Sequence, residues 1–137
     1  MTTQFVDTNI FLRYLTKDDP QKAPACLALF QKAQQNRVRL TTSECVIAET
    51  VYLLSSKKVY SLQPQEVKER LAPLLHLRAL RIEHKETLIT ALDLYGAYHI
   101  DFEDCLSVAH MERQQLTEIY SYDQDFDQVK HIQRCEP

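Results

Sequence analysis

The sequence has 137 residues, of which 45% are hydrophobic and 26% charged, and its formal net charge is −3. This composition is typical of a globular protein, and the length predicts a single domain over residues 1–137. No apolar stretch approaches the ~20 residues that cross a bilayer, and the N-terminus has no basic segment followed by an apolar run. We therefore expect a cytoplasmic protein with no signal peptide and no membrane partner. The single glycine, Gly96, excludes the P-loop and the dinucleotide-binding loop, since each needs several glycines.

The negative net charge argues weakly against a nucleic-acid partner, because such proteins usually carry a basic excess. A metal pocket that gathered six acids would leave the remaining surface net positive, and the candidates are Asp7, Glu49, Asp101, Asp104, Asp123 and Asp125. The four cysteines form no C-x-x-C pair, which in a chain of this length indicates reduced, mostly buried thiols of a cytosolic protein. They are Cys26, Cys45, Cys105 and Cys135.

In the first half of the chain, short apolar segments alternate with segments of helical periodicity. Residues 4–6 predict a short buried strand, and Asp7-Thr8-Asn9 are good caps for a helix that continues to Leu15. Asp18-Asp19-Pro20 predicts the end of that helix and the start of another, over about 20–35. The next elements are a strand at 38–40, a helix capped by Thr42 or Ser43 that fades near 55–58, and a helix from Pro64.

The second half of the chain continues the alternation of strands and helices. The expected elements are strands at 80–82 and 119–121, helices at 85–98 and 101–115, a polar turn at 122–127 and a last short segment around Ile132. Short strands between longer helices predict an α/β fold with a central, mostly parallel sheet of four to five strands flanked by helices. The ligand site of such a sheet lies beyond the carboxyl ends of its strands.

Four acids stand at unusual places in this pattern. Asp7 directly follows the first strand, and Asp123 follows the fourth strand by two residues. Glu49 and Asp104 border the apolar stripes of their helices, where an ionised carboxylate is unfavourable unless it is paired or metal-bound. Asp101, three residues before Asp104, shares its helix face. The four positions together indicate a site.

Carboxylates drawn together repel one another, and a hard divalent cation removes that conflict. Oxygen ligands favour Mg²⁺, Mn²⁺ or Ca²⁺ over zinc, and the five histidines show no H-E-x-x-H spacing. Two such ions about 3.5–4 Å apart would stabilise an in-line phosphoryl displacement. Each acid also has a simpler explanation. Asp7 and Asp101 are suitable helix caps, Asp123 and Asp125 suit a turn, and Glu49 could pair with a basic residue.

The ordered set of acidic motifs resembles the PIN-domain ribonucleases, especially the VapC toxins of toxin–antitoxin pairs. The motifs are Val6–Leu15 with Asp7, Val46–Leu54 with Glu49, Asp101–Leu106 with Asp104, and Ser121–Asp127 with Asp123. The likeness spans nearly the whole chain. Cys105 stands where the family has alanine, and Ser121-Tyr122 where it has threonine with an aromatic residue; neither departure removes an acid.

The resemblance implies a parallel sheet flanked by helices and an acidic pocket that binds one or two Mg²⁺ or Mn²⁺ ions. It implies endonucleolytic cleavage of RNA by metal-activated water, leaving a 5′-phosphate. It also implies a homodimer and a small antitoxin protein that blocks the pocket.

On this basis we assign Asp7, Glu49, Asp104 and Asp123 as the catalytic metal carboxylates, with Asp101, Asp125, Thr8 and Asn9 as auxiliary residues. Arg13 is a candidate RNA contact, although a surface salt bridge explains it equally well. Two alternatives remain open, a catalytically silent PIN-like binding module and a magnesium-dependent phosphatase. The phosphatase would need a second aspartate two residues after Asp7, where Asn9 stands.

Overall fold

The structure is a computed structural model that describes residues 1–137. It contains six α-helices, five short strands and one 3₁₀ helix in an alternating order. The helices are α1 (Thr8–Thr16), α2 (Ala23–Gln34), α3 (Glu44–Ser55), α4 (Pro64–Leu75), α5 (Lys85–Ala97) and α6 (Phe102–Arg113). The strands are β1 (Thr3–Phe5), β2 (Arg39–Thr42), β3 (Leu80–Ile82), β4 (Glu118–Tyr120) and β5 (Gln133–Cys135), and the 3₁₀ helix is η1 (Gln124–Gln128). None of the helices combines the length and the apolar composition needed to cross a lipid bilayer.

The first three strands form a parallel sheet in the order β1-β2-β3. The pairing continues one residue past β1, because the Val6 N–H donates to the Thr41 carbonyl at 2.9 Å and the Thr42 hydroxyl donates to the Val6 carbonyl at 2.7 Å. The carboxyl ends of parallel strands lie at one edge of a sheet. Asp7 after β1 and His84 after β3 therefore stand at the same edge.

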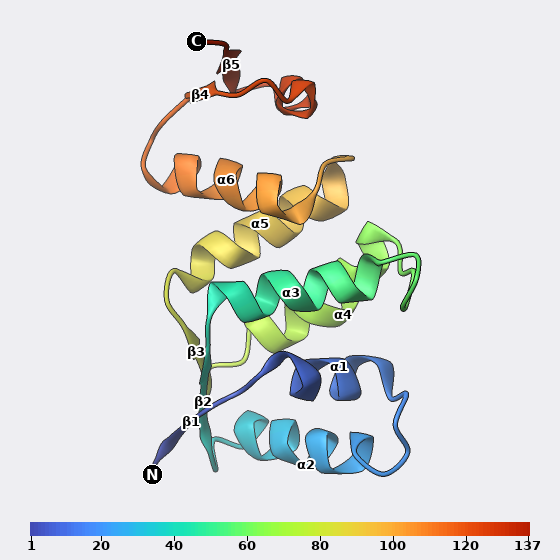
Figure 1. The fold of residues 1–137 in the computed structure, drawn as a ribbon. Helices are drawn as coiled ribbons and strands as arrows, with labels where there is room; N and C mark the ends of the chain where they lie inside the picture. Colours follow the sequence, from blue (N-terminus) through green and yellow to red (C-terminus); the bar gives the residue numbers. More distant parts are fainter.

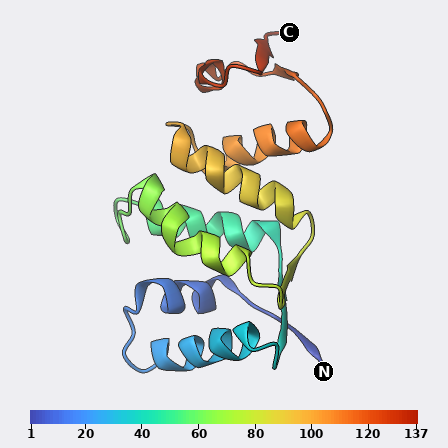
Figure 2. The ribbon, with the colours of Figure 1, turned by 180° about the vertical axis from the view of Figure 1, so that it is seen from behind.

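The helices are stacked in pairs beside this sheet (Figures 1 and 2). The pair of α1 and α2 lies at one end, α3 and α4 lie in the middle, and α5 and α6 lie beyond them. Helix α5 contacts both α4 and α6 along its length. A cluster of 32 buried hydrophobic residues runs through the stack from Val6 to Ile132 and forms the core.

Strands β4 and β5 form a second parallel sheet. Both views place it at the opposite end of the stack from the N-terminus, next to η1. The α/β class and the parallel strands are confirmed, whereas the single central sheet expected from the sequence is divided into two. The two sheets are separate because α5 and α6 lie between β1 and β4, the strand that follows α6. Strand β1 consequently has an open edge, and Phe5 is 61% exposed.

The helix boundaries follow the local chemistry of the sequence. The Ser43 hydroxyl caps α3 by accepting the Val46 N–H at 3.2 Å, as one of the two expected caps. Helix α2 begins at Ala23 rather than at Pro20. The Asp19 carboxylate accepts the N–H groups of Gln21 and Lys22, which holds these residues in a turn before the helix.

Replacing Leu88 with Ala tests the central position of α5. Leu88 is 1% exposed in the core. Its truncation should lower the free energy of unfolding by about 2–5 kcal/mol, as a buried Leu→Ala change does when the cavity cannot collapse. Urea unfolding followed by circular dichroism measures the loss. The control Val59→Ala, at a half-exposed position, should change stability by less than about 0.5 kcal/mol. Equal effects of the two changes would contradict the packing.

Candidate active site

Three of the expected acids are gathered at one place in the structure. Asp104 of α6 and Asp123 and Asp125 of the η1 turn each offer a carboxylate oxygen, and the three oxygens lie within 4.8 Å of one another. Asp104 is half-buried, and the other two side chains are exposed. The group therefore opens to solvent on one side and rests on the first turns of α6 on the other.

The environment of Asp104 disfavours its charged form. Partial burial raises the pKa of the Asp104 carboxyl above its ordinary value, and the nearby negative charges of Asp123, Asp101, Asp125 and Glu103 raise it further. No cationic side chain forms a salt bridge with Asp104. The cluster thus holds negative charge that the protein itself does not compensate.

The turn that carries Asp123 is fixed by hydrogen bonds at both sides. The Asp123 N–H donates to the Ser121 hydroxyl at 3.0 Å, and the Asp123 carboxylate accepts the Asp125 N–H at 2.9 Å. Asp123 is therefore the cap of η1 as well as a member of the cluster. The motif analysis assigned no role to Ser121, although serine generally tends to bond a nearby backbone N–H, and that tendency could have indicated one.

Asp101 caps α6 through its backbone, since the Cys105 N–H donates to the Asp101 carbonyl while the carboxylate makes no capping hydrogen bond. Its charge acts on Asp104, as the pKa of Asp104 records. Burial raises the pKa of the neighbouring Cys105 thiol to about 12. Cys105 is a buried core residue, at the position where the motif resemblance led us to expect alanine.

Asp7 and Glu49 lie together at a different place. Asp7 is the N-terminal cap residue of α1, but its exposed carboxylate makes no capping hydrogen bond. The next residue, Thr8, is buried, and its hydroxyl donates to Glu49 on α3 at 3.0 Å. Thr8 thus links the end of β1 to the acid of the second motif, and its auxiliary role in the site stays a prediction. Glu49 is exposed rather than bordering the core.

The structure does not bring the four main acids into one group. Asp7 stands at the edge of the three-stranded sheet, whereas η1 with Asp123 lies at the far end of the helix stack in both views (Figures 1 and 2). Glu49 and Asp7 are absent from the cluster of three carboxylates. The sequence pattern could not predict this separation, because the separation depends on the position of β4 at the far end of the helix stack.

Arg13 is engaged within the protein. One of its terminal nitrogens donates to both oxygens of Asp18 at 3.2 Å and to the Tyr60 hydroxyl at 3.4 Å, and Tyr60 donates to Asp18. Its Nε is buried without a partner. The salt bridge, the simpler of the two explanations from sequence, is present, and the RNA contact stays a prediction. Asn9 is exposed and makes no side-chain hydrogen bond.

Residues 5–132 match the family model of the PIN domain. The chain belongs to the PIN-domain family. The resemblance seen in the motifs is thereby confirmed, and the match covers all four of them. No curated protein is significantly similar to the chain.

Two solved structures are similar to the chain at low sequence identity. The toxin VapC20 of Mycobacterium tuberculosis, described as cleaving the sarcin–ricin loop, has 20% identity, a TM-score of 0.41, and coverage of 93% of this chain and 95% of its own. The VapBC2 complex of Rickettsia felis, bound to a DNA fragment from its promoter, has 16% identity, a TM-score of 0.39, and coverage of 98% of both chains. Membership of the PIN-domain family rests on the family model.

The raised pKa of Asp104 predicts a stability that falls with pH in metal-free buffer. The folded protein holds this proton more tightly than the unfolded chain, so the stabilisation is full below the ordinary value of 3.8 and is lost as pH rises through the raised pKa. Asp104→Asn imitates the protonated form. At pH 7 in EDTA it should raise the melting temperature, on the order of 2 °C.

The increase should disappear as the pH falls toward 3.8. The control is Asp93→Asn on α5, an exposed aspartate paired with Lys68 at 3.4 Å, which should give no increase. Scanning calorimetry from pH 3.5 to 8 provides the measurement, and an Asp104→Asn protein that melts below wild type at pH 7 would contradict the electrostatic account.

Proposed function

We propose that the protein is a metal-dependent endoribonuclease, a VapC-like toxin that hydrolyses RNA phosphodiester bonds with carboxylate-bound Mg²⁺ or Mn²⁺. One observation carries the proposal: a chain matched by the PIN-domain model over residues 5–132 gathers Asp104, Asp123 and Asp125 within 4.8 Å. A binding module without catalysis would have no need to keep three repelling carboxylates together.

The donor set fits a hard divalent cation. All three side chains offer oxygen, so the group favours Mg²⁺ or Mn²⁺ over softer metals. The charges that raise the pKa of Asp104 are those a cation would neutralise. When bound, such an ion supplies Lewis-acid activation of water and neutralises charge at a phosphoryl group.

The residues of the chain have distinct tasks in this proposal. Asp104 and Asp123 hold the ion, and Asp125 and Asp101 add negative charge around them. Ser121 and the Asp125 N–H fix the turn, which orients the Asp123 carboxylate toward Asp104. Asp7 and Glu49 remain proposed ligands through the motif resemblance, and Thr8 orients Glu49. Asn9 and Arg13 keep their proposed auxiliary and RNA-binding roles on the same basis.

We also propose a cytoplasmic homodimer that is bound by a small antitoxin protein, and a single domain over residues 1–137. The four free cysteines agree with a reducing compartment. The continuous core agrees with one cooperative unit. Exposed apolar side chains around β4 offer area for a second copy, and they are Leu116, Tyr120 and Tyr122. The antitoxin is inferred from the motif resemblance alone.

Cleavage of a mixed RNA pool tests the enzyme class. The wild-type protein should cut RNA in Mg²⁺ or Mn²⁺ and be silent in EDTA. Asp104→Asn should lower the rate at least about 100-fold, since even changes to groups behind the ligands cost about 10–100-fold in metal sites. Asp93→Asn, which keeps the fold and lies on the other helix of the pair, should cut at the wild-type rate. A folded Asp104→Asn protein with unchanged rate would remove Asp104 from the mechanism.

Asp7→Asn in the same assay determines whether the first motif belongs to the site. A loss as large as that of Asp104→Asn supports a ligand role for Asp7 in the active state. A wild-type rate would restrict the ligands to Asp104, Asp123 and Asp125. Cleavage that continues in EDTA would reject metal dependence altogether.

Thermal shifts provide a readout that does not depend on the RNA substrate. A cation that binds the folded protein stabilises it in proportion to occupancy, so 1 mM Mn²⁺ should raise the wild-type melting temperature. The increase should be reduced in Asp104→Asn and unchanged in Asp93→Asn. Equal increases in the three proteins would place Mn²⁺ outside the acidic cluster.

A further inference from the structure

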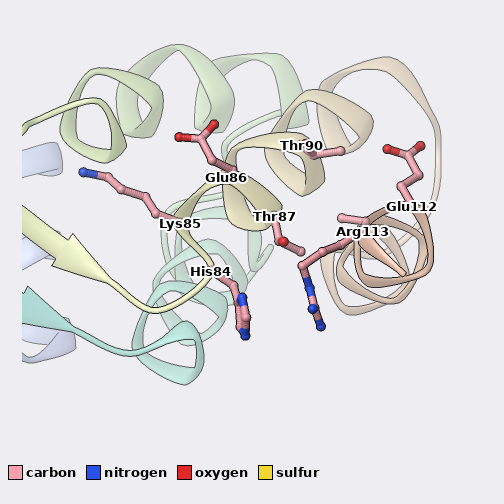
Figure 3. A pocket seen from close by; sticks show the side chains of 8 residues that line it. His84, Lys85, Glu86, Thr87, Thr90, Glu112 and Arg113 are labelled. Carbon is pink, nitrogen blue, oxygen red and sulfur yellow. The ribbon is translucent and has the colours of Figure 1, made fainter. Parts of the chain in front are cut away.

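We infer that a second polar site, at the start of α5, binds a phosphate group of the RNA backbone. The inference rests on the proposed ribonuclease function for the identity of the ligand. The site is a cavity of about 410 Å³ formed by the first turn of α5 and the last turn of α6. Figure 3 shows the side chains that line it.

The backbone at this point presents free donors. Helix α5 has 13 residues, and its first internal hydrogen bonds run from the Thr87 and Leu88 N–H groups to the His84 carbonyl. The N–H groups of Lys85 and Glu86 make no hydrogen bond in the structure. Such free N–H groups, together with the positive end of the helix dipole, favour an anion.

Thr87 supplies an independent observation. Its side chain is only 5% exposed, yet its hydroxyl makes no hydrogen bond in the structure. In Figure 3 it projects into the cavity between the side chains of His84 and Arg113, which extend in the same direction. The one buried side-chain polar atom without a partner is Arg13 Nε, so the Thr87 oxygen is open to the cavity rather than sealed in the core. A phosphate oxygen between His84 and Arg113 would accept a hydrogen bond from it.

The Arg113 guanidinium and the His84 ring line the cavity beside the hydroxyl, and the His110 ring lies next to both. The rings of His84 and His110 lie edge to face with centroids 6.3 Å apart, and an Arg113 nitrogen lies 3.4 Å from His110 Nδ1. His84 has a left-handed backbone, with φ of 53°, which turns the chain sharply from β3 into α5. The guanidinium of Arg113 has no carboxylate partner of its own, so it is available to a ligand.

The nearby acids are engaged or directed elsewhere. Glu112 pairs with His131 at 3.0 Å, and Glu44 pairs with His110 at 2.7 Å. Glu86 points away from the His84 and Arg113 side chains in Figure 3. Lys85 also points away, because its Nζ donates to the carbonyls of Leu77 and Leu80 at 2.6 Å. Glu83 lies beside His84, with its carboxylate 3.8 Å from His84 Nε2. Arg113 is therefore the cation that faces the Thr87 hydroxyl.

The position of the site connects it with RNA. His84 follows β3 and Asp7 follows β1 in the sheet order β1-β2-β3, so the two lie two strand spacings apart, about 10 Å, on one edge. A strand of RNA that reaches Asp7 along this edge passes the start of α5. A bound phosphodiester would pair with the Thr87 hydroxyl and would supply the anion that the Arg113 guanidinium lacks.

In the first arm of the test, inorganic phosphate is titrated into the wild-type protein in EDTA, and binding is monitored by ¹H–¹⁵N NMR. The amide signals of Lys85, Glu86 and Thr87 should shift on titration. The shifts should be lost in Thr87→Val, which removes only the hydroxyl, and in Arg113→Gln. The control is Arg78→Gln, an exposed arginine outside this cavity, which should behave as wild type. Identical shifts in all four proteins, or no shift in the wild type, would overturn the phosphate site.

The second arm measures binding of a fluorescent single-stranded RNA in EDTA, where cleavage is blocked. Arg113→Gln should weaken binding about tenfold relative to Arg78→Gln, the order expected for one charge-assisted hydrogen bond. It should also reduce the slope of log K against log salt by about 0.7, the value for one phosphate contact on a single strand. Phosphate shifts with unchanged RNA affinity would overturn the assignment to RNA and leave a site for free phosphate.

The two proposals fail separately. If the wild-type protein cuts no RNA, the ribonuclease function fails, while the phosphate titration still decides whether the α5 site exists. If it cuts RNA, Arg113→Gln should raise KM and leave kcat within about twofold, as expected for a contact made equally in ground state and transition state. A fall in kcat with unchanged KM would contradict a binding role.

Discussion

The packing of α5 between α4 and α6 is the constraint on which the rest of the molecule depends. Leu88, Ala91 and Leu92 are all but removed from solvent, and they join the two halves of the helix stack. This packing fixes α6, whose first turns carry Asp104, and it fixes the start of α5 beside the last turn of α6. Both the acidic cluster and the proposed phosphate site therefore lie on the same pair of helices, one toward each end.

The elements that the sequence predicted well are those with strong local signals. The strand at 80–82 has the expected bounds, and α3 begins at the serine cap that the sequence offered. Helical periodicity and capping are local, so they survive in any tertiary arrangement. The position of β4 is not local. Its three residues pair with β5 and leave the edge of β1 open, because two helices separate them.

The difference between local and non-local signals also explains which residues of the candidate site could be predicted. Asp104, Asp123 and Asp125 come together because α6 and the η1 turn are close in the chain, and Phe126 of η1 is buried in the same core as the apolar residues of α6. Thr8, the neighbour of Asp7, donates to Glu49, a contact between α1 and α3 that the sequence analysis did not predict. The distance between the Asp104 cluster and the pair of Asp7 and Glu49 depends on the division of the strands into two sheets. The spacing of the motifs along the chain does not predict that division. His84, Thr87 and Arg113 lay outside every motif and were found only through the cavity that they share.

The sequence posed capping and metal binding as alternatives for each aspartate, and Asp123 shows why they are compatible. One carboxylate oxygen accepts the Asp125 N–H, which fixes the direction of the side chain, while the carboxylate still offers oxygen lone pairs toward Asp104. A cap of this kind removes rotational freedom before any ion arrives, so less entropy is lost on binding. The structural role thus prepares the chemical one. Thr8 has the same relation to Glu49, since its buried hydroxyl orients a carboxylate that remains exposed for a ligand.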